Sequence, residues 1–338
     1  MIERIVIENF KSLKKVDLKL GQLNLFIGTN ASGKSNFFDA LRVLQGIGYG
    51  FTLHEILDGK PKGASSEVWD GIRGGSQRAT SSTSGPDELV RFQVSGKFQK
   101  EWSGKSWSYI IAFSAPEGRL REEQFWIGGE TIYDSSQLVN SAVDPVFEVR
   151  YYGGKKGRQP HLKFEKNRPV LCQFAQGANG KWAKSHAEAA EQLVQLLADV
   201  QRIDPSPNLL RSYSHAHEIR RMGEHGENFA ALVKSICAQP AVKEAYVSWL
   251  KELRPREVED VGTLPGAVGE PLFMLKEGGR EYPAQVLSDG TLRFAAITAA
   301  FFQPEMPRLL TIEEIENGIH ASRLRLLVEL LRNRSSKG

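Results

Sequence analysis

Alternating apolar and polar residues dominate the first half of the chain, and this period of two predicts β-strands. Two short runs before residue 21 predict a strand pair, with apolar positions at Ile2, Ile5, Ile7, Val16, Leu18 and Leu20. Residues 87–166 repeat the pattern with glycine-containing turns between the runs, which predicts an antiparallel meander. The apolar positions of this region are Val90, Phe92, Val94, Trp107, Tyr109, Ile111, Phe113, Phe125, Ile127, Ile132, Val149, Tyr151, Leu162 and Phe164. Its aromatic and basic residues could also stack on single-stranded nucleic acid, but a half-buried sheet face uses the same residues.

Helical spacing replaces this pattern at residues 185–254. One amphipathic run ends near Val200, and a second begins at Phe229 and is interrupted at Pro240. No heptad pattern persists, so we expect no long coiled-coil arm. Residues 54–86 show no period and are rich in Gly, Ser, Thr and Lys, which predicts a long mobile loop. We interpret Gln77 in this loop as a solvated side chain rather than a sensor of the γ-phosphate.

The stretch Gly-Thr-Asn-Ala-Ser-Gly-Lys-Ser-Asn at residues 28–36 matches the phosphate-loop pattern G-x-x-x-x-G-K-[ST]. Leu23, Leu25 and Ile27 alternate before it as in a strand, and a helical run that ends near Gly46 and Gly48 follows it. The loop amides and the helix N-terminus suit phosphate oxygens. We assign nucleotide contacts to Gly28, Asn30, Ala31, Ser32, Gly33, Lys34, Ser35 and Asn36, with Lys34 at the β- and γ-phosphates and Ser35 on Mg²⁺.

Two further motifs lie in the last 70 residues. Strand signals at Leu272–Leu275 and at Tyr282 flank Gly278-Gly279 and predict a hairpin. Ser288 then precedes a helical run as an N-cap, with Gly290 in the first turn, which gives a second anion site or a plain capped helix.

A short strand at residues 309–312 ends in Glu313 and Glu314. Carboxylates at the carboxyl end of such a strand lie on the ligand side of an open α/β sheet. We expect Glu313 to hold Mg²⁺ through its water shell and Glu314 to orient and polarise the attacking water. The alternative is an acidic loop after the strand.

Composition narrows the class of protein without defining it. The chain has 338 residues, 41% of them hydrophobic, and its net charge of +4 is too small to argue for nucleic-acid binding by itself. Basic clusters at residues 11–15 and 155–158 are interpreted as solvated loops. Cys172 and Cys237 have no metal-ligand spacing, and His215, His217 and His225 are interpreted as ordinary histidines. The sequence shows no signal peptide and no spanning segment, so we expect a cytoplasmic protein with no membrane partner.

Together these motifs resemble the ABC-type ATPase heads of RecF and SMC-like proteins, particularly compact bacterial AAA family ATPases found beside DNA-repair and phage-defence genes. The resemblance covers nearly the whole chain and includes residues 7–12, the phosphate loop with Asn36, residues 226–230, residues 287–293 and residues 312–320. It implies an α/β fold: a P-loop NTPase of ABC-head type with an antiparallel β subdomain and a helical subdomain. It further implies that Ser288 and Gly290 of one copy close over ATP–Mg²⁺ on the other.

From this resemblance we expect four parts. Residues 1–52 and 263–338 form the ATPase core, residues 53–184 the loop and β insertion, and residues 185–262 the helical subdomain. The expected function is an ATPase that forms a homodimer around ATP and controls DNA engagement or a nuclease or toxin effector. The Glu313-Glu314 pair replaces the usual aspartate and glutamate, and no switch histidine follows His320. Either the chain is truncated, or a partner supplies the missing strand, or hydrolysis is slow or absent. A nucleotide sensor that hydrolyses ATP slowly or not at all is therefore the alternative, and a transporter subunit is the weaker third.

Overall fold

The computed structural model describes the chain except for residues 61–68, 82–88, 100–101, 103, 137, 139–143, 154–158, 178–181, 216–218, 254–257, 318–320 and 336–338. The fold is mixed α/β and divides into two compact units, Met1–Val200 and Gln201–Gly338. Each unit has its own hydrophobic residues at its centre and is described by itself.

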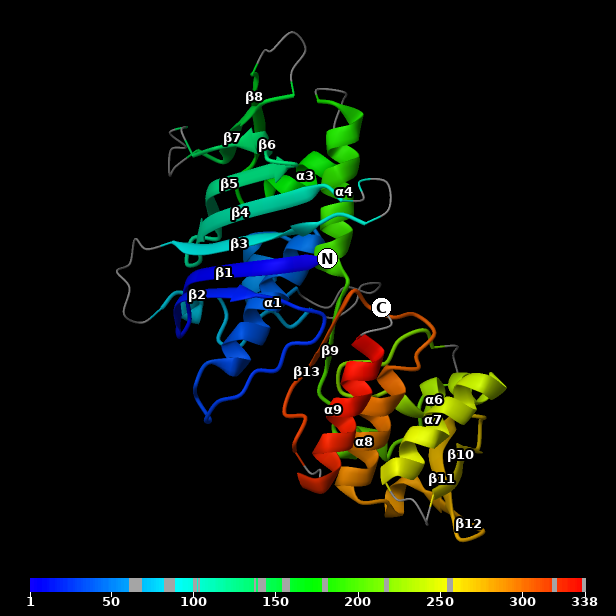
Figure 1. Ribbon diagram of the computed structural model, residues 1–338. Coiled ribbons are helices and arrows are strands. Elements are labelled where there is room, and N and C mark those ends of the chain that lie inside the picture. Colours follow the sequence, from blue (N-terminus) through cyan, green and yellow to red (C-terminus); the bar gives the residue numbers. More distant parts are fainter. Residues whose placement is uncertain are drawn as a thin grey trace. The chain divides into compact units, whose positions relative to one another are not determined.

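Unit 1 is built on an eight-stranded sheet in which every strand pair is antiparallel, with the order β2-β1-β3-β4-β5-β6-β7-β8 (Figure 1). The strands are β1 Ile2–Phe10, β2 Leu13–Lys19, β3 Val90–Lys97, β4 Ser106–Ser114, β5 Arg119–Ile127, β6 Glu130–Asp134, β7 Val146–Tyr151 and β8 His161–Glu165. The predicted hairpin and meander are thus confirmed. Their apolar positions lie on one face, because alternate side chains of a strand point to the same side. Those of β1 and of the meander are buried, whereas Val16 and Leu18 of β2 are half-buried.

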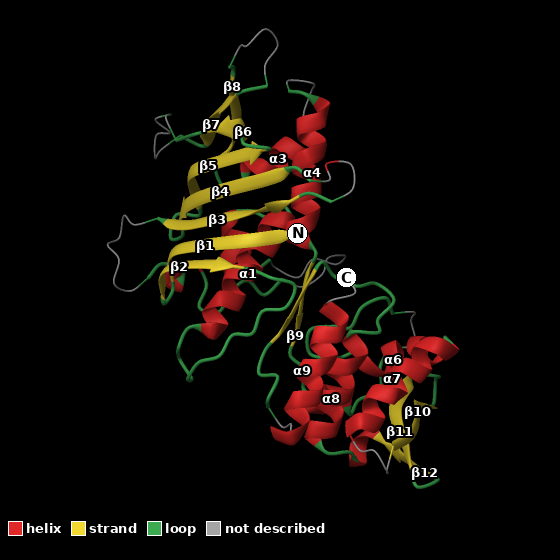
Figure 2. Ribbon diagram, in the orientation of Figure 1, coloured by secondary structure: helices red, strands yellow, loops and turns green. Residues whose placement is uncertain are grey.

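Helices α1 Lys34–Gly48, α3 Val170–Ala175 and α4 Lys184–Ala198 lie on that face of the sheet (Figure 2). The packing of α1 on α4 depends on Gly48, because a Cβ built there would lie 2.2 Å from the Ala198 nitrogen. Gly48 is the last residue of α1, so the predicted helix end is confirmed, and Gly46 and Gly48 also permit the close approach of α2 (Leu53–Asp58) and α4.

The prediction of a long mobile loop at residues 54–86 is wrong for the described part of this segment. Helix α2 occupies Leu53–Asp58, and Trp69 and Ile72 are buried after it. The Trp69 indole N–H donates to the Ile56 carbonyl at 3.2 Å. A few isolated apolar side chains hold this segment against α2, and isolated residues leave no period to detect. Gln77 lies in a short 3-10 helix, Ser76–Arg78, and is exposed as expected.

The predicted strand before the phosphate loop is also not present. Leu23, Leu25 and Ile27 lie in irregular chain, and their exposed fractions are 40%, 61% and 86%. One edge of the unit 1 sheet is β2, which ends at Lys19, and among the described strands of this unit none pairs with residues 23–27. Alternation alone does not make a strand where no partner strand is available.

Unit 2 combines helices with two small sheets. Its helices are α5 Pro207–Leu210, α6 Phe229–Cys237, α7 Pro240–Leu253, α8 Asp289–Ala300 and α9 Ala321–Ser335. One sheet has the order β10-β11-β12, from Val258–Pro265, Pro271–Glu277 and Arg280–Pro283, and the other pairs β13 Leu309–Ile312 with β9 Val200–Ile203. The predicted helices and the hairpin across Gly278-Gly279 are confirmed, whereas β10 was not predicted.

Helix α8 forms the centre of unit 2, because its residues 291–300 are all buried. The buried Tyr246 of α7 donates its hydroxyl to the Ala295 carbonyl of α8 at 3.0 Å. Pro240 begins α7 rather than breaking a longer helix, a position that proline tolerates. None of the described helices has both the length and the apolar character needed to cross a membrane.

Candidate functional site

The phosphate loop leads directly into α1 in unit 1. Gly33 is the N-cap residue with φ 95°, and in the described chain no side chain caps the helix start. The first N–H groups of α1 have no intrahelical acceptor, so they are available for an anion. The Lys34 ammonium lies back over the loop and donates to the carbonyls of Gly28 at 2.5 Å and Thr29 at 3.0 Å. Phosphate oxygens can replace these two carbonyls as acceptors for the Lys34 ammonium. The donors of the loop therefore fit a triphosphate such as ATP.

The turn between β1 and β2 supports the loop. A Cβ at Gly33 would lie 2.9 Å from the Ser12 hydroxyl oxygen, so the loop has no room for a side chain there. The Asn36 amide donates to the same hydroxyl at 2.7 Å. Asn36 thus ties α1 to the β1–β2 turn, which accounts for the serine at the end of residues 7–12 and for the asparagine after the loop.

A buried carboxylate that the sequence analysis missed holds the first turns of α1. Asp39 is 2% exposed and pairs with the Lys11 ammonium and with the Arg73 guanidinium, whose Nε lies 3.2 Å away. Arg73 also donates to the Ser35 carbonyl, and Lys11 donates to the Arg73 carbonyl at 2.7 Å. Three distant segments therefore meet below the loop, and no local pattern could have indicated this.

The segment at residues 287–293 of unit 2, which carries Ser288 and Gly290, has the predicted helix-cap geometry. Ser288 is the exposed N-cap of α8, and its hydroxyl oxygen accepts from the Thr291 N–H at 3.3 Å. It also lies 2.9 Å from the Thr291 hydroxyl oxygen. Gly290 is in the first turn, as expected. The cap is confirmed, whereas contact with nucleotide stays a prediction.

The two strand-end carboxylates differ in their surroundings. Glu313 is buried, and its carboxylate lies 3.2 Å from the Arg202 guanidinium. Glu314 is exposed and has φ 48°, an uncommon left-handed conformation for a residue other than glycine. The Asn317 amide donates to the Glu314 carboxylate at 3.1 Å. Both carboxylates offer the oxygen ligands that Mg²⁺ prefers, so the donor set fits this ion.

Arg293 connects these motifs within unit 2. This buried side chain of α8 donates to the Pro205 carbonyl at 2.7 Å and lies 3.4 Å from both the Asp204 carboxylate and the Glu314 carbonyl. Helix α8 and the Glu314 turn are therefore in contact, while the phosphate loop belongs to unit 1. An arginine inside an otherwise apolar helix was the available sequence signal, and the sequence analysis did not use it.

The histidines form no metal centre among the described residues, which contain no group of three potential ligands. His225 lies with Nδ1 3.1 Å from the Asp204 carbonyl, and His217 and His320 are outside the described residues. The cluster at residues 155–158 is outside them as well. Cys172 and Cys237 are free thiols, and burial raises the pKa of Cys172 to about 12.

The phosphate-loop motif at the start of α1 indicates a nucleotide-binding protein, and the comparison with known families identifies an ATPase. The family described as "AAA domain, putative AbiEii toxin, Type IV TA system" matches residues 161–338, more than half of the chain, so the chain belongs to this family. Residues 1–51 match the AAA ATPase domain. The prediction of an AAA-type ATPase is thereby confirmed.

Individual relatives are distant. An "ATP/GTP phosphatase" of Helicobacter pylori is 25% identical over 339 residues, which cover 97% of this chain and 80% of the relative. Among solved structures, an SMC head bound to the C-winged helix domain of ScpA has a TM-score of 0.47 at 12% identity, covering 99% of this chain and 87% of that one. The recombination mediator RecF with ATP has a TM-score of 0.35 at 13% identity, covering 98% and 90%.

Proposed function

We propose that the chain binds ATP with Mg²⁺ and hydrolyses it, with the triphosphate on the amides of the phosphate loop. The start of α1 carries this proposal, because its N–H groups are left uncapped by any described side chain and Gly33 takes a left-handed φ of 95°. The ATP/GTP phosphatase name of the Helicobacter pylori relative supports the same substrate class.

Each residue of the motifs has a role in this proposal. Lys34 neutralises the β- and γ-phosphates, and Ser35 and Glu313 hold Mg²⁺. The ion supplies charge neutralisation on the phosphate oxygens. Glu314 orients the attacking water and accepts its proton. The exposed position of the Glu314 carboxylate and its hydrogen bond from Asn317 support this role.

Dimerisation completes the proposed site. Ser288 and Gly290 of a second copy cover the γ-phosphate, and the closed homodimer controls DNA engagement or a nuclease or toxin effector in repair or anti-phage defence. The toxin named in the family description supports an effector system. A cytoplasmic location belongs to the same proposal.

Glu314→Gln tests the catalytic assignment. Glutamine keeps the shape of the side chain but accepts no proton, so ATP turnover should fall by about a hundredfold while ATP remains bound. Size-exclusion chromatography with ATP and Mg²⁺ should then show a trapped dimer, and Lys34→Ala, which loses the phosphate contact, should stay monomeric. Unchanged turnover in Glu314→Gln would remove Glu314 from the mechanism.

A nucleotide sensor that hydrolyses ATP slowly is the second candidate, and one contact favours it. Arg202 lies 3.2 Å from the carboxylate of Glu313 and so competes with a cation for this group. Steady-state turnover of the chain, measured with and without DNA, separates the two candidates. Turnover clearly above that of Lys34→Ala would exclude the sensor.

A further inference from the structure

Strand β8 is an edge of the sheet in unit 1, and its outer side presents main-chain groups. Antiparallel strands bond through alternate residues. Two bonds flanking the β7–β8 ladder show which residues of β8 face β7: Tyr151 N–H to the Pro160 carbonyl at 2.9 Å, and Lys166 N–H to the Pro145 carbonyl at 3.0 Å. It follows that the N–H and C=O groups of His161, Lys163 and Glu165 point away from β7.

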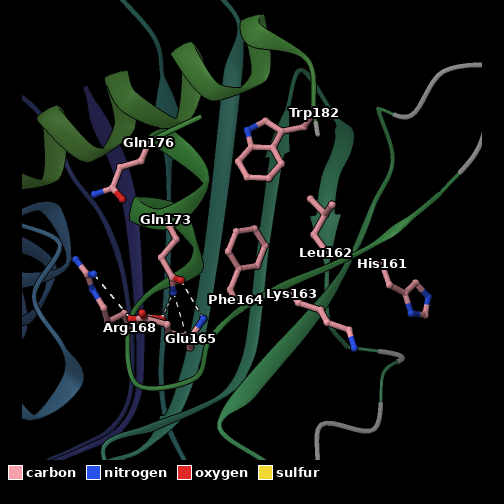
Figure 3. Close-up of a pocket in the computed structure, with 9 residues that line it drawn as sticks. All are labelled: His161, Leu162, Lys163, Phe164, Glu165, Arg168, Gln173, Gln176 and Trp182. Atoms are coloured by element: carbon pink, nitrogen blue, oxygen red, sulfur yellow. Dashed lines mark hydrogen bonds and ion pairs between the residues drawn. The ribbon is translucent and has the colours of Figure 1, made fainter. Parts of the chain in front are cut away.

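A side-chain amide already occupies one of these outward positions. The Glu165 N–H donates to Gln173 Oε1 at 2.9 Å, and Gln173 Nε2 donates to the Glu165 carbonyl at 3.0 Å (Figure 3). Gln173 therefore exchanges two bonds with one residue, as a peptide group in an antiparallel pair does. The next outward main-chain groups, those of His161 and Lys163, have no hydrogen-bond partner among the described residues.

A pocket of about 410 Å³ lies beside this edge. Figure 3 shows its lining residues, which are His161, Leu162, Lys163, Phe164, Glu165, Arg168, Gln173, Gln176 and Trp182. The Trp182 ring lies 5.8 Å from that of Phe164 and stacks on Phe174 at 4.7 Å, so it is held in place. The pocket thus combines an apolar surface with a polar rim, which is typical of a site for one large side chain.

We propose that this edge and pocket bind an extended segment of a partner protein as an additional antiparallel strand. The partner residue opposite Lys163 exchanges two main-chain hydrogen bonds with it, and the following residue, opposite Leu162, is large and apolar and enters the pocket beside Trp182. Gln173 ends the added strand, because it occupies the groups of Glu165. The bound segment is therefore short.

Charge selects the residue opposite Lys163. The Lys163 side chain is 69% exposed, and it shares the single carboxylate of Glu148 with His161, at 3.1 Å and 3.5 Å. Directly opposed side chains share one face of a sheet, so an acidic residue is favoured there. The partner motif is an acidic residue followed by a large apolar one.

The same charges disfavour a second copy of this chain as the occupant. Two β8 strands in antiparallel register would place Lys163 opposite either Lys163 or His161 of the other copy. Such a ladder gathers basic groups on one face, and like charges directly opposed are destabilising. A foreign acidic segment meets no such repulsion.

The proposal is tested by phage display: the full chain is immobilised, and peptides that bind it are selected from a library of random heptapeptides. Lys163→Pro removes the outward N–H, and proline is tolerated at an edge position whose N–H faces away from the sheet. Lys163→Ala is the matched control, because it loses the charge but keeps the main-chain groups. Acidic-apolar peptides should be enriched on the parent. On Lys163→Ala the apolar residue should still be selected while the preference for an acidic residue weakens, and Lys163→Pro should bind the enriched peptides at least about tenfold more weakly than the parent.

Methylation of peptide nitrogens gives a test that needs no protein variant. In synthetic copies of an enriched peptide, N-methylation of the acidic residue should lower affinity about tenfold, since that N–H faces Lys163. Methylation of the apolar residue, whose N–H faces away, should have little effect. No enrichment over Lys163→Pro, or equal loss at successive nitrogens, would overturn the proposal. Self-association of the parent that Lys163→Pro abolishes would overturn it in favour of a second copy.

Discussion

The helices α1 and α8 both begin at a motif that the sequence marks as an anion site, yet their first turns differ. At α8 the Thr291 N–H is bound by the hydroxyl oxygen of its own N-cap, Ser288. At α1 the N-cap is Gly33, and no described side chain accepts from the first turn. A capped helix start is stable without a ligand, whereas an uncapped one retains donors for it. We therefore expect the phosphate loop to be the stronger anion site of the two.

The uncapped start of α1 depends on Asp39, and replacing this residue should have the largest effect on stability. Asp39→Asn removes the negative charge that pairs with Lys11 and Arg73. The Lys11 ammonium would then stay unpaired in a buried place, because the Lys11 side chain is only 8% exposed. Breaking a buried ion pair from one side costs about 4 kcal/mol, because the remaining charge stays buried. Urea unfolding should show this decrease in the free energy of unfolding.

Asp17→Asn is the control for this prediction. Asp17 pairs with Arg4 at the surface, where both side chains are 47% exposed, so its replacement should change stability little. Equal losses in the two variants would show that burial of Asp39 does not matter. A stable Asp39→Asn variant with normal ATP binding would show that α1 needs no such support.

The sequence predicted the features that depend on interactions between residues close together in the chain, and it missed those that depend on residues far apart. The meander and α8 were predicted because alternation, caps and glycine turns are local. Residues 23–27 and 309–312 carry similar apolar patterns, but only the second run forms a strand, because β9 pairs with it. The partners of Asp39 and Glu313 come from distant segments, and no spacing rule reveals them. Strand β10 is too polar to show a clear period.

The first N–H groups of helix α3 are satisfied in a third way, by a carboxylate from a strand. This arrangement leads to the prediction with the next largest effect. The Glu123 carboxylate of β5 accepts from the N–H groups of Val170 and Leu171, both at 2.7 Å, and from two tyrosine hydroxyls, those of Tyr109 and Tyr133. Burial raises the pKa of Glu123 from 4.5 to about 7, and the four donors oppose that rise. A carboxylate here takes the place that phosphate takes at α1 in our proposal.

This shift makes stability depend on pH with a defined sign. A carboxyl whose pKa is higher in the folded chain contributes its full stability below about pH 4.5 and loses it as the pH rises through 7. The loss amounts to about 3 kcal/mol over that range. Glu123→Gln does not titrate, so the difference between parent and variant isolates this group. If urea unfolding gives both proteins the same pH dependence, Glu123 has an ordinary pKa.

The smallest effect concerns Ser288, and it separates capping from nucleotide contact. Ser288→Ala should lower the free energy of unfolding by about 1 kcal/mol, because the Thr291 N–H loses its acceptor. Ser288→Gly should cost less stability, since glycine is a tolerated N-cap, yet it also lacks the hydroxyl. If Ser288 contacts the γ-phosphate of a second copy, both variants should lose the ATP-dependent dimer in size-exclusion chromatography. A dimer that persists in Ser288→Gly and weakens only in Ser288→Ala would limit Ser288 to capping α8, and α1 would then be the one anion site of the two.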